Sequence, residues 1–157
     1  MTVRVRALTD ADRAWVAGIA RELWGSAVVV AHGEVFEPAE LSGFVAEDDG
    51  ERVGLLTHHA DRDVCEVVTI DAFEPRRGVG TALMGAALSL GHRRVRLITT
   101  NDNAPAQRFY ERLGFRLVAV REGELERSRE RKPEIPLVGV GGVPIRDELE
   151  YELLRPR

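Results

Sequence analysis

The pattern of apolar and polar residues predicts a strand followed by a helix at the start of the chain. Residues 3–8 (VRVRAL) alternate as a β-strand does, and Thr9 is a good N-cap for a helix that runs to about Trp24. Residues 26–42 show no clear period and read as a loop with a short helix after Pro38.

The middle of the chain predicts three strands and a helix. Residues 43–60 predict two strands around the turn EDDGE, in which Gly50 can adopt a positive φ. Residues 63–73 (DVCEVVTIDAF) are apolar and β-branched, as expected of a central strand. Helical spacing follows over residues 81–90, and Gly91 stands where a glycine ends a helix.

A second strand and helix follow this pair. Residues 93–100 predict a strand, and residues 104–113 predict a helix that Asn103 caps and Gly114 ends. Residues 115–122 predict another strand.

The remaining residues are less regular. Residues 123–132 predict a short solvated helix, and residues 133–146 are rich in proline and glycine yet apolar. Residues 147–155 alternate like a strand, although a helix is a rival interpretation. Because strands alternate with helices and antiparallel hairpins come first, the predicted class is a mixed-sheet α/β or α+β domain over residues 1–157.

Composition narrows the functions open to this chain. It has 157 residues, a formal net charge of −4 and one cysteine, Cys65. The charge argues against a nucleic-acid partner, the lone cysteine excludes a disulfide or cysteine zinc cluster, and no apolar run could span a membrane. Residues 1–10 lack a signal-peptide pattern, so we expect a cytoplasmic protein. The histidines are scattered, and no metal site is expected.

Residues 74–88, EPRRGVGTALMGAAL, place two arginines and two glycines just ahead of the predicted helix. A helix N-terminus presents unpaired N–H groups that bind phosphate, and glycine lets a phosphate approach them closely. The spacing matches neither the Walker loop nor the G-x-G-x-x-G motif. Alone, the stretch fits either a phosphate site or a tight strand-to-helix turn.

A second motif follows the next predicted strand. Asn103, Ala106, Tyr110, Gly114 and Phe115 stand in TTNDNAPAQRFYERLGF, along one helix that ends in Gly-Phe. With the glycine stretch before it, this motif resembles the GNAT superfamily of acyl-CoA-dependent N-acetyltransferases. The resemblance implies a twisted mixed sheet of six to seven strands flanked by about four helices.

The resemblance also implies a binding site for acetyl-CoA. The family's pyrophosphate loop corresponds here to PRRGVG, residues 75–80, with Pro75 as a departure that removes a side-chain donor and a backbone N–H. Asn103 and Tyr110 complete the second motif. The backbone N–H groups implied to hold the diphosphate are those of Arg76, Arg77, Gly78, Val79, Gly80 and Thr81.

The implied reaction moves an acetyl group to an amine by direct attack in a ternary complex. The pantetheine arm would lie between splayed parallel strands at residues 64–70 and 94–100. The N–H of Ile70 or a neighbour would then stabilise the developing oxyanion. Tyr110 would protonate the departing thiolate, or be a core tyrosine.

A general base is needed if the acceptor is an alkylamine, because an amine of pKa near 10.4 is neutral in only about one molecule in 2,500 at pH 7. Glu66 is the leading candidate, since on a regular strand it shares a face with Val68 and Ile70. The alternative for Glu66 is a structural ion pair with an arginine. Asp71 is the second candidate base.

The acceptor is expected to contact residues 22–44 and 133–146, with Asp147 and Glu148 available to a cation. A small amine is the first expectation, and a protein or peptide N-terminus is the second. A non-catalytic acyl-CoA-binding module stays open because of Pro75. An aminoacyl-tRNA transferase is disfavoured, since no basic stripe is visible. A homodimer is common in the superfamily.

Overall fold

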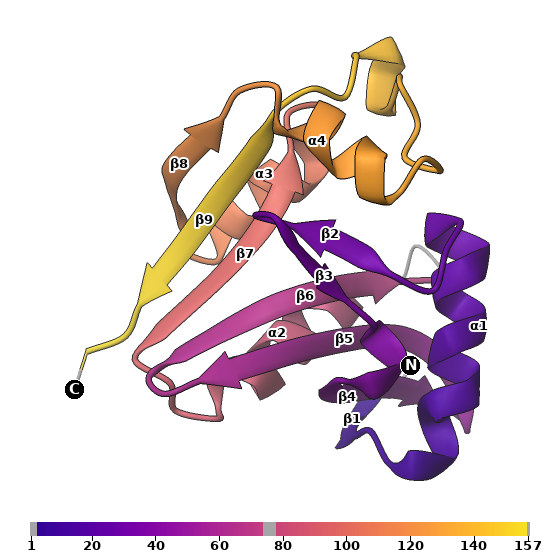
Figure 1. The fold of residues 1–157 in the computed structure, drawn as a ribbon. Helices are drawn as coiled ribbons and strands as arrows, with labels where there is room; N and C mark the ends of the chain where they lie inside the picture. Colours follow the sequence, from indigo (N-terminus) through magenta and orange to yellow (C-terminus); the bar gives the residue numbers. More distant parts are fainter. Residues whose placement is uncertain (1–2, 74–77, 157) are drawn as a thin grey trace.

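The computed structural model describes residues 3–73 and 78–156, which form a seven-stranded mixed sheet (Figure 1). Every neighbouring pair is antiparallel except β6 and β7, which run parallel. The predicted class and the central position of residues 63–73 are confirmed, because β6 is fourth of seven. The order is β1 (Val3–Ala7), β4 (Ser42–Asp48), β5 (Glu51–Asp61), β6 (Val64–Ala72), β7 (Arg94–Thr100), β9 (Glu148–Leu154) and β8 (Arg116–Arg121).

Four α-helices flank the sheet: α1 (Arg13–Trp24), α2 (Val79–Leu88), α3 (Ala104–Arg112) and α4 (Glu124–Arg131). In the view of Figure 1, α2 lies behind the sheet, and the β2–β3 hairpin (β2, Val29–Ala31; β3, Glu34–Phe36) crosses in front of it. The main core lies on the α2 side, where Leu83 and Met84 pack with Leu97 and Tyr151. Close packing there depends on Gly54, whose added Cβ would lie 2.6 Å from Val79.

The first helix begins later than the sequence pattern predicts. Thr9 caps a short 3-10 turn, η1 (Asp10–Asp12), before α1 starts, and Gly25 with φ 73° ends α1. The carboxylate of Asp12 is buried and lies 2.8 Å from Arg6 and 3.0 Å from Arg52. Its hydrogen bond from Arg6 lowers the pKa of Asp12 well below the usual range, so this buried acid is structural.

Residues 26–42 contain a hairpin that the sequence reading missed. β2 and β3 are only three residues each, and they are joined by the two-residue turn His32-Gly33. Both turn residues have positive φ, 41° and 79°, which is the backbone of a tight hairpin turn. The short helix expected after Pro38 is present as η2 (Pro38–Glu40).

The strand interpretation of residues 147–155 is confirmed, and the helical rival is wrong. β9 alternates along its length, with Leu149 and Tyr151 in the α2-side core. Glu148, Glu150 and Glu152 alternate with them on the opposite face. Before β9, residues 133–146 contain η3 (Val140–Gly142) and an isolated β-bridge between Val138 and Pro144. None of the helices within the described residues is long and apolar enough to cross a membrane.

The parallel ladder between β6 and β7 ends halfway along the strands. Its last pair is Val67 with Leu97, after which β6 stays paired with β5, and β7 stays paired with β9. The two strands therefore diverge, and Figure 1 shows the gap opening towards the β2–β3 hairpin. We call this region the gap: Val68–Ala72 of β6 facing Ile98–Thr100 of β7.

A β-bulge lies at the start of the gap. The register passes from His58–Val67 to Thr57–Thr69, which makes Val68 an extra residue in β6. The bulge changes the face of every later side chain, so the expectation that Glu66 shares a face with Ile70 is wrong. Ile70 packs against the α2-side core, whereas Glu66 lies on the hairpin side.

Candidate active site

A cavity of about 610 Å³ lies on the α2 and α3 side of the gap. Predicted site residues from three separate segments line it together: Ile70 from β6, Gly78, Gly80 and Thr81 from the start of α2, and Asn103 and Tyr110 from α3. Val79 does not line it, and its side chain is fully buried in the core. Pro75, Arg76 and Arg77 lie outside the described residues.

The two glycines at the start of α2 have different physical roles. Gly78 has φ 83°, and an added Cβ would meet no atom within 4 Å, so the space beside this backbone is open. Gly80 lies on the helix, and its added Cβ would be 3.1 Å from the ring of Phe109 in α3. Gly80 therefore allows α2 and α3 to approach, while Gly78 leaves the first turn accessible to an anion.

Backbone N–H groups of β6 point into the gap. Phe73 donates its N–H to Val53 of β5, and successive residues of a strand direct their N–H groups to opposite sides. The N–H groups of Asp71 and Thr69 consequently point towards β5, as that of Phe73 does. The N–H groups of Ile70 and Ala72 point into the gap. This alternation directs the N–H of Ile70 into the gap, where the sequence analysis expects it to stabilise an oxyanion.

Tyr110 is 7 % exposed and lines the same cavity. Burial, followed by the charge of Asp71, raises the pKa of Tyr110 well above the ordinary value of 10. The phenol thus stays protonated at neutral pH and can act only as a proton donor. Proton transfer to a thiolate of pKa near 8.5 is more uphill than the ~2 kcal/mol expected for an ordinary tyrosine.

Asp71, the second candidate base, belongs to this cavity as well. Burial raises the pKa of Asp71 from 3.8 to about 6. Asp71 pairs with Leu55 of β5, and its side chain alternates with those of Ile70 and Ala72 along β6.

A second cavity, of about 170 Å³, lies on the hairpin side of the same gap. Its walls are mainly aliphatic, and two buried carboxylates reach it: Glu66, which is 6 % exposed, and Glu148, which is 2 % exposed. The aliphatic walls come from Val29, Val30, Val68, Ile98 and Leu125. Such a cavity suits a small cation that carries an apolar group.

Glu66 is held by a histidine that sequence reasoning passed over. Nε2 of His32 lies 2.8 Å from both carboxylate oxygens of Glu66. Arg96 of β7 is more distant, with its Nε 3.8 Å from Glu66. Its hydrogen bond to the Glu66 carboxylate raises the pKa of His32 above its usual 6.5, although burial opposes this shift.

Glu148 is joined to the same hairpin turn. Its Oε1 accepts the backbone N–H of His32 at 2.6 Å, while its Oε2 has no hydrogen-bond partner among the described residues. Arg121 lies 3.5 Å from Oε2, beyond good hydrogen-bond geometry. A buried carboxylate beside a cavity, with one oxygen that lacks a hydrogen bond, is suited to an ammonium ligand.

Asp147 and residues 133–146, which the sequence analysis also assigned to the acceptor, do not line the hairpin-side cavity. Asp147 accepts the N–H of Gly123 and caps the start of α4, so its role is structural. Residues 133–146 are held over the N-terminus of α3, where Asp102 accepts the N–H of Val140. The apolar character of this segment therefore gave no direct guide to the cavity.

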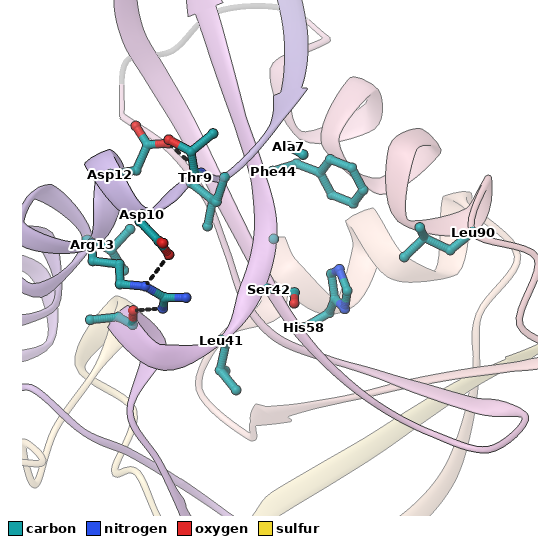
Figure 2. Close-up of a pocket in the computed structure, with 14 residues that line it drawn as sticks. Ala7, Thr9, Asp10, Asp12, Arg13, Leu41, Ser42, Phe44, His58 and Leu90 are labelled. Atoms are coloured by element: carbon teal, nitrogen blue, oxygen red, sulfur yellow. Dashed lines mark hydrogen bonds and ion pairs between the residues drawn. The ribbon is translucent and has the colours of Figure 1, made fainter.

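A third cavity, of about 350 Å³, lies far from the gap, between the start of α1, β4 and the end of α2 (Figure 2). Figure 2 shows that its charged groups are already paired, with Arg13 bonded to Asp10 at 3.0 Å and to the carbonyl of Ala39. None of the predicted site residues lines it.

Cysteine and metal chemistry find no support in the described part of the chain. Cys65 is fully buried, and burial raises the pKa of its thiol to about 11. Within residues 3–73 and 78–156, no three His, Cys, Asp or Glu side chains gather closely enough to hold a metal ion. His58 packs on Phe44 and His59 on Phe36, on opposite faces of β5 as predicted.

Comparison with known proteins places this arrangement in a family. Residues 13–115 match the model of the acetyltransferase (GNAT) family. Two Bacillus subtilis (strain 168) proteins are similar over most of their length. YxbD is 39 % identical over 131 residues, covering 80 % of this chain and 82 % of that protein. YdhI is 37 % identical over 133 residues, covering 82 % and 83 %.

Solved structures share the fold at lower identity. An IAA acetyltransferase from Bacillus cereus has a TM-score of 0.74 and 15 % identity, covering 98 % of this chain and all of its own. A Bacillus subtilis acetyltransferase in complex with CoA has a TM-score of 0.70 and 18 % identity, covering 99 % and 100 %. The ribosomal-protein-S18-alanine N-acetyltransferase of Escherichia coli has a TM-score of 0.68 and 16 % identity, covering 98 % and 94 %.

The family model spans most of the chain, including β6, α2 and α3, which line the larger cavity; we call it the donor-side cavity. The chain belongs to the acetyltransferase (GNAT) family of acetyl-CoA-dependent acyltransferases.

Proposed function

We propose that one domain over residues 1–157 transfers an acetyl group from acetyl-CoA to a small primary amine by direct attack in a ternary complex. One observation carries this proposal: two cavities of different chemistry are lined by the two sides of a single gap in the sheet. The larger, donor-side cavity suits a long anionic donor. The smaller, acidic cavity on the hairpin side suits a cationic acceptor, and we call it the acceptor-side cavity.

The larger cavity fits the diphosphate and pantetheine of acetyl-CoA. Its volume of about 610 Å³ lies in the range of cofactor pockets, and it runs from the first turn of α2 to the gap. Gly78 leaves room for phosphate oxygens at the helix N-terminus, where the helix dipole favours negative charge. Ile70 and Ala72 would offer backbone N–H groups to an extended arm and to the thioester carbonyl.

On the hairpin side, Glu66 would accept a proton from the amine and leave it nucleophilic. Glu66 retains lone pairs for this purpose, because each carboxylate oxygen can accept more than one hydrogen bond. Asp71 is less well placed as the base, since it does not line the hairpin-side cavity, where Glu66 lies. Glu148 would attract the ammonium group of the incoming acceptor through its negative charge.

On the donor side, Ile70 would stabilise the developing oxyanion, and Tyr110 would give its proton to the departing sulfur. The raised pKa of Tyr110 makes this transfer costly, so we expect the phenol to help the reaction without being indispensable. Attack of the amine on the thioester then requires the two substrates to lie close together, and the shared gap would bring them together.

The size of the acceptor-side cavity favours a small molecule. About 170 Å³ corresponds to roughly six water molecules at ~30 Å³ each, or a short alkylamine. A protein N-terminus is the second candidate, because proteins of similar fold include the ribosomal-protein-S18-alanine N-acetyltransferase. The acidic cavity and the net charge of −4 do not favour a nucleic-acid partner. A cytoplasmic location belongs to the proposal, which the single unpaired cysteine supports.

An acceptor panel tests the proposal. Purified protein with acetyl-CoA would be assayed for amine-dependent release of CoA thiol, using short alkylamines, a bulky polyamine and a peptide with a free N-terminus. We expect the short alkylamines to give the highest kcat/KM. A preference for the peptide would favour the second candidate, and thiol release by none of the amines would favour a non-catalytic acyl-CoA-binding module.

A further inference from the structure

His32 occupies a costly backbone position. It is the first residue of the two-residue turn between β2 and β3, with φ 41°, where Asn or Gly is usual. A left-handed backbone is unfavourable for a residue with a Cβ, because the Cβ crowds the carbonyl oxygen. Strain of this kind persists where the surrounding structure holds it and is concentrated at functional sites.

The surroundings hold this turn at three points. The backbone N–H of His32 donates to Glu148, its ring contacts Glu66, and Arg131 of α4 donates to the carbonyl of Gly33. One residue therefore joins both carboxylates of the acceptor-side cavity, one through its backbone and the other through its imidazole.

Glu66 lies between two cavities. On one side it lines the acceptor-side cavity, and on the other it lines a polar cavity of about 200 Å³ that we call the outer cavity. His32 lines the outer cavity and does not line the acceptor-side one. A proton leaving the acceptor through Glu66 thus meets His32 next.

We propose that Nε2 of a neutral His32 accepts, from Glu66, the proton that the acceptor amine releases, and that the imidazolium then gives up its Nδ1 proton to water in the outer cavity. This inference rests on the proposed N-acetyltransferase function. In this account His32 is a positioning and proton-accepting residue behind Glu66, rather than a group that touches the substrate.

The proton balance of amine acetylation requires such an exit. An ammonium acceptor, R–NH3+, loses two N–H protons as its nitrogen forms the bond to the acetyl carbon. One of them ends on the CoA sulfur when the carbon–sulfur bond breaks, either through Tyr110 or directly. The other must reach bulk water, and Glu66 is 6 % exposed, so it needs a neighbour that can take the proton on.

The charge environment sets the direction of the pH dependence. Glu66 raises the pKa of His32, and His32 must be neutral to accept a proton, so kcat/KM should rise as the pH increases through the pKa of His32. The other charged groups around His32 are Glu34 on β3, Arg96 on β7, Glu148 on β9, His59 and Asp61 on β5, and Arg131 on α4.

The test is His32→Gln, which keeps a hydrogen-bond donor for Glu66 but cannot take up a proton. For an alkylamine of pKa near 10.4, we expect kcat/KM at pH 7 to fall on the order of 10- to 100-fold, with recovery as the pH is raised. For a weakly basic amine of pKa near 7.7, which is partly neutral already, we expect a loss of less than about 3-fold. His92→Gln, a histidine remote from the gap, is the matched control and should match the wild type.

A merely structural role would give the same loss with both amines at every pH, and that result would overturn the inference. A second arm does not depend on turnover: NMR titration of the His32 imidazole in wild type and in Glu66→Gln. We expect the pKa of His32 to fall when the Glu66 charge is removed, and an unchanged value would contradict the coupling. A wild type that acetylates no amine would instead remove the proposed function, and this inference with it.

Discussion

The two cavities on either side of the gap are built in different ways. The donor-side cavity comes from β6, α2 and α3, which lie within one stretch of the chain, and it depends on backbone N–H groups, glycines and one tyrosine. The acceptor-side cavity draws on β2, β6, β7, α4 and β9, and depends on charged side chains buried among aliphatic ones. The residues that line the donor-side cavity therefore form a compact sequence motif. The residues that line the acceptor-side cavity are spread along the chain.

The largest expected effect separates the chemistry of the two cavities. In Glu66→Gln the base is lost, and we expect kcat/KM with an alkylamine to fall about 10²- to 10⁴-fold. Affinity for acetyl-CoA, measured by calorimetry, should stay within about 2-fold, because Glu66 does not line the donor-side cavity. The matched control is Glu126→Gln on the exposed face of α4. An unchanged pH–rate profile in Glu66→Gln would rule out Glu66 as the base.

On the donor side, Tyr110→Phe removes the proposed acid. We expect kcat to fall about 10- to 1,000-fold, with KM for the amine little changed. The raised pKa of Tyr110 makes the lower end of this range the more natural result, since water can also protonate the thiolate. Wild-type kcat in the variant would remove Tyr110 from the mechanism.

Glu148→Gln tests whether the acceptor-side cavity recognises charge. The amide keeps an acceptor for the His32 N–H but removes the negative charge beside the unpaired Oε2 position. We expect KM for an ammonium acceptor to rise on the order of 10-fold, with kcat changed much less. Equal loss in kcat and no change in KM would assign Glu148 to the chemistry instead of to binding.

The smallest effect concerns stability. Asp71 has its pKa raised to about 6 in the folded protein, against 3.8 when unfolded, so the folded state binds the proton more tightly. The free energy of unfolding should fall as the pH rises from about 4 to about 6, and Asp71→Asn should recover roughly 3 kcal/mol at pH 8. The gain should vanish at pH 4 in urea titrations. An equal gain at both pH values would show that ionisation is not its cause.

Sequence reasoning found the donor side because its signals are local. Gly78, Asn103 and Tyr110 stand at fixed spacings around two predicted helices, and the structure brings all three to one cavity. The class of the fold followed from alternating patterns in residues 63–73 and 93–100. Boundaries were less accurate where side chains override the pattern, as Asp12 does when Arg6 and Arg52 pair with it ahead of α1.

The acceptor side could not be read in the same way. A single extra residue at Val68 reverses the faces of β6, and nothing in VCEVVTI marks the bulge. The hairpin that carries His32 has strands of three residues, too short for a period to appear. The pairing of His32 with Glu66 and Glu148 joins positions far apart in the chain, which only the folded sheet brings together.

The central claim is that the first turn of α2 and the gap form one site for acetyl-CoA, and calorimetry tests it directly. Acetyl-CoA would be titrated into wild type, Gly78→Asp and Gly85→Asp. Both positions have open space around an added Cβ, and aspartate tolerates the positive φ of Gly78 better than most residues, so folding should survive in each. We predict micromolar binding by wild type and Gly85→Asp, and its loss in Gly78→Asp, whose carboxylate would repel the diphosphate. Equal binding by all three proteins, or no binding by wild type, would contradict the account.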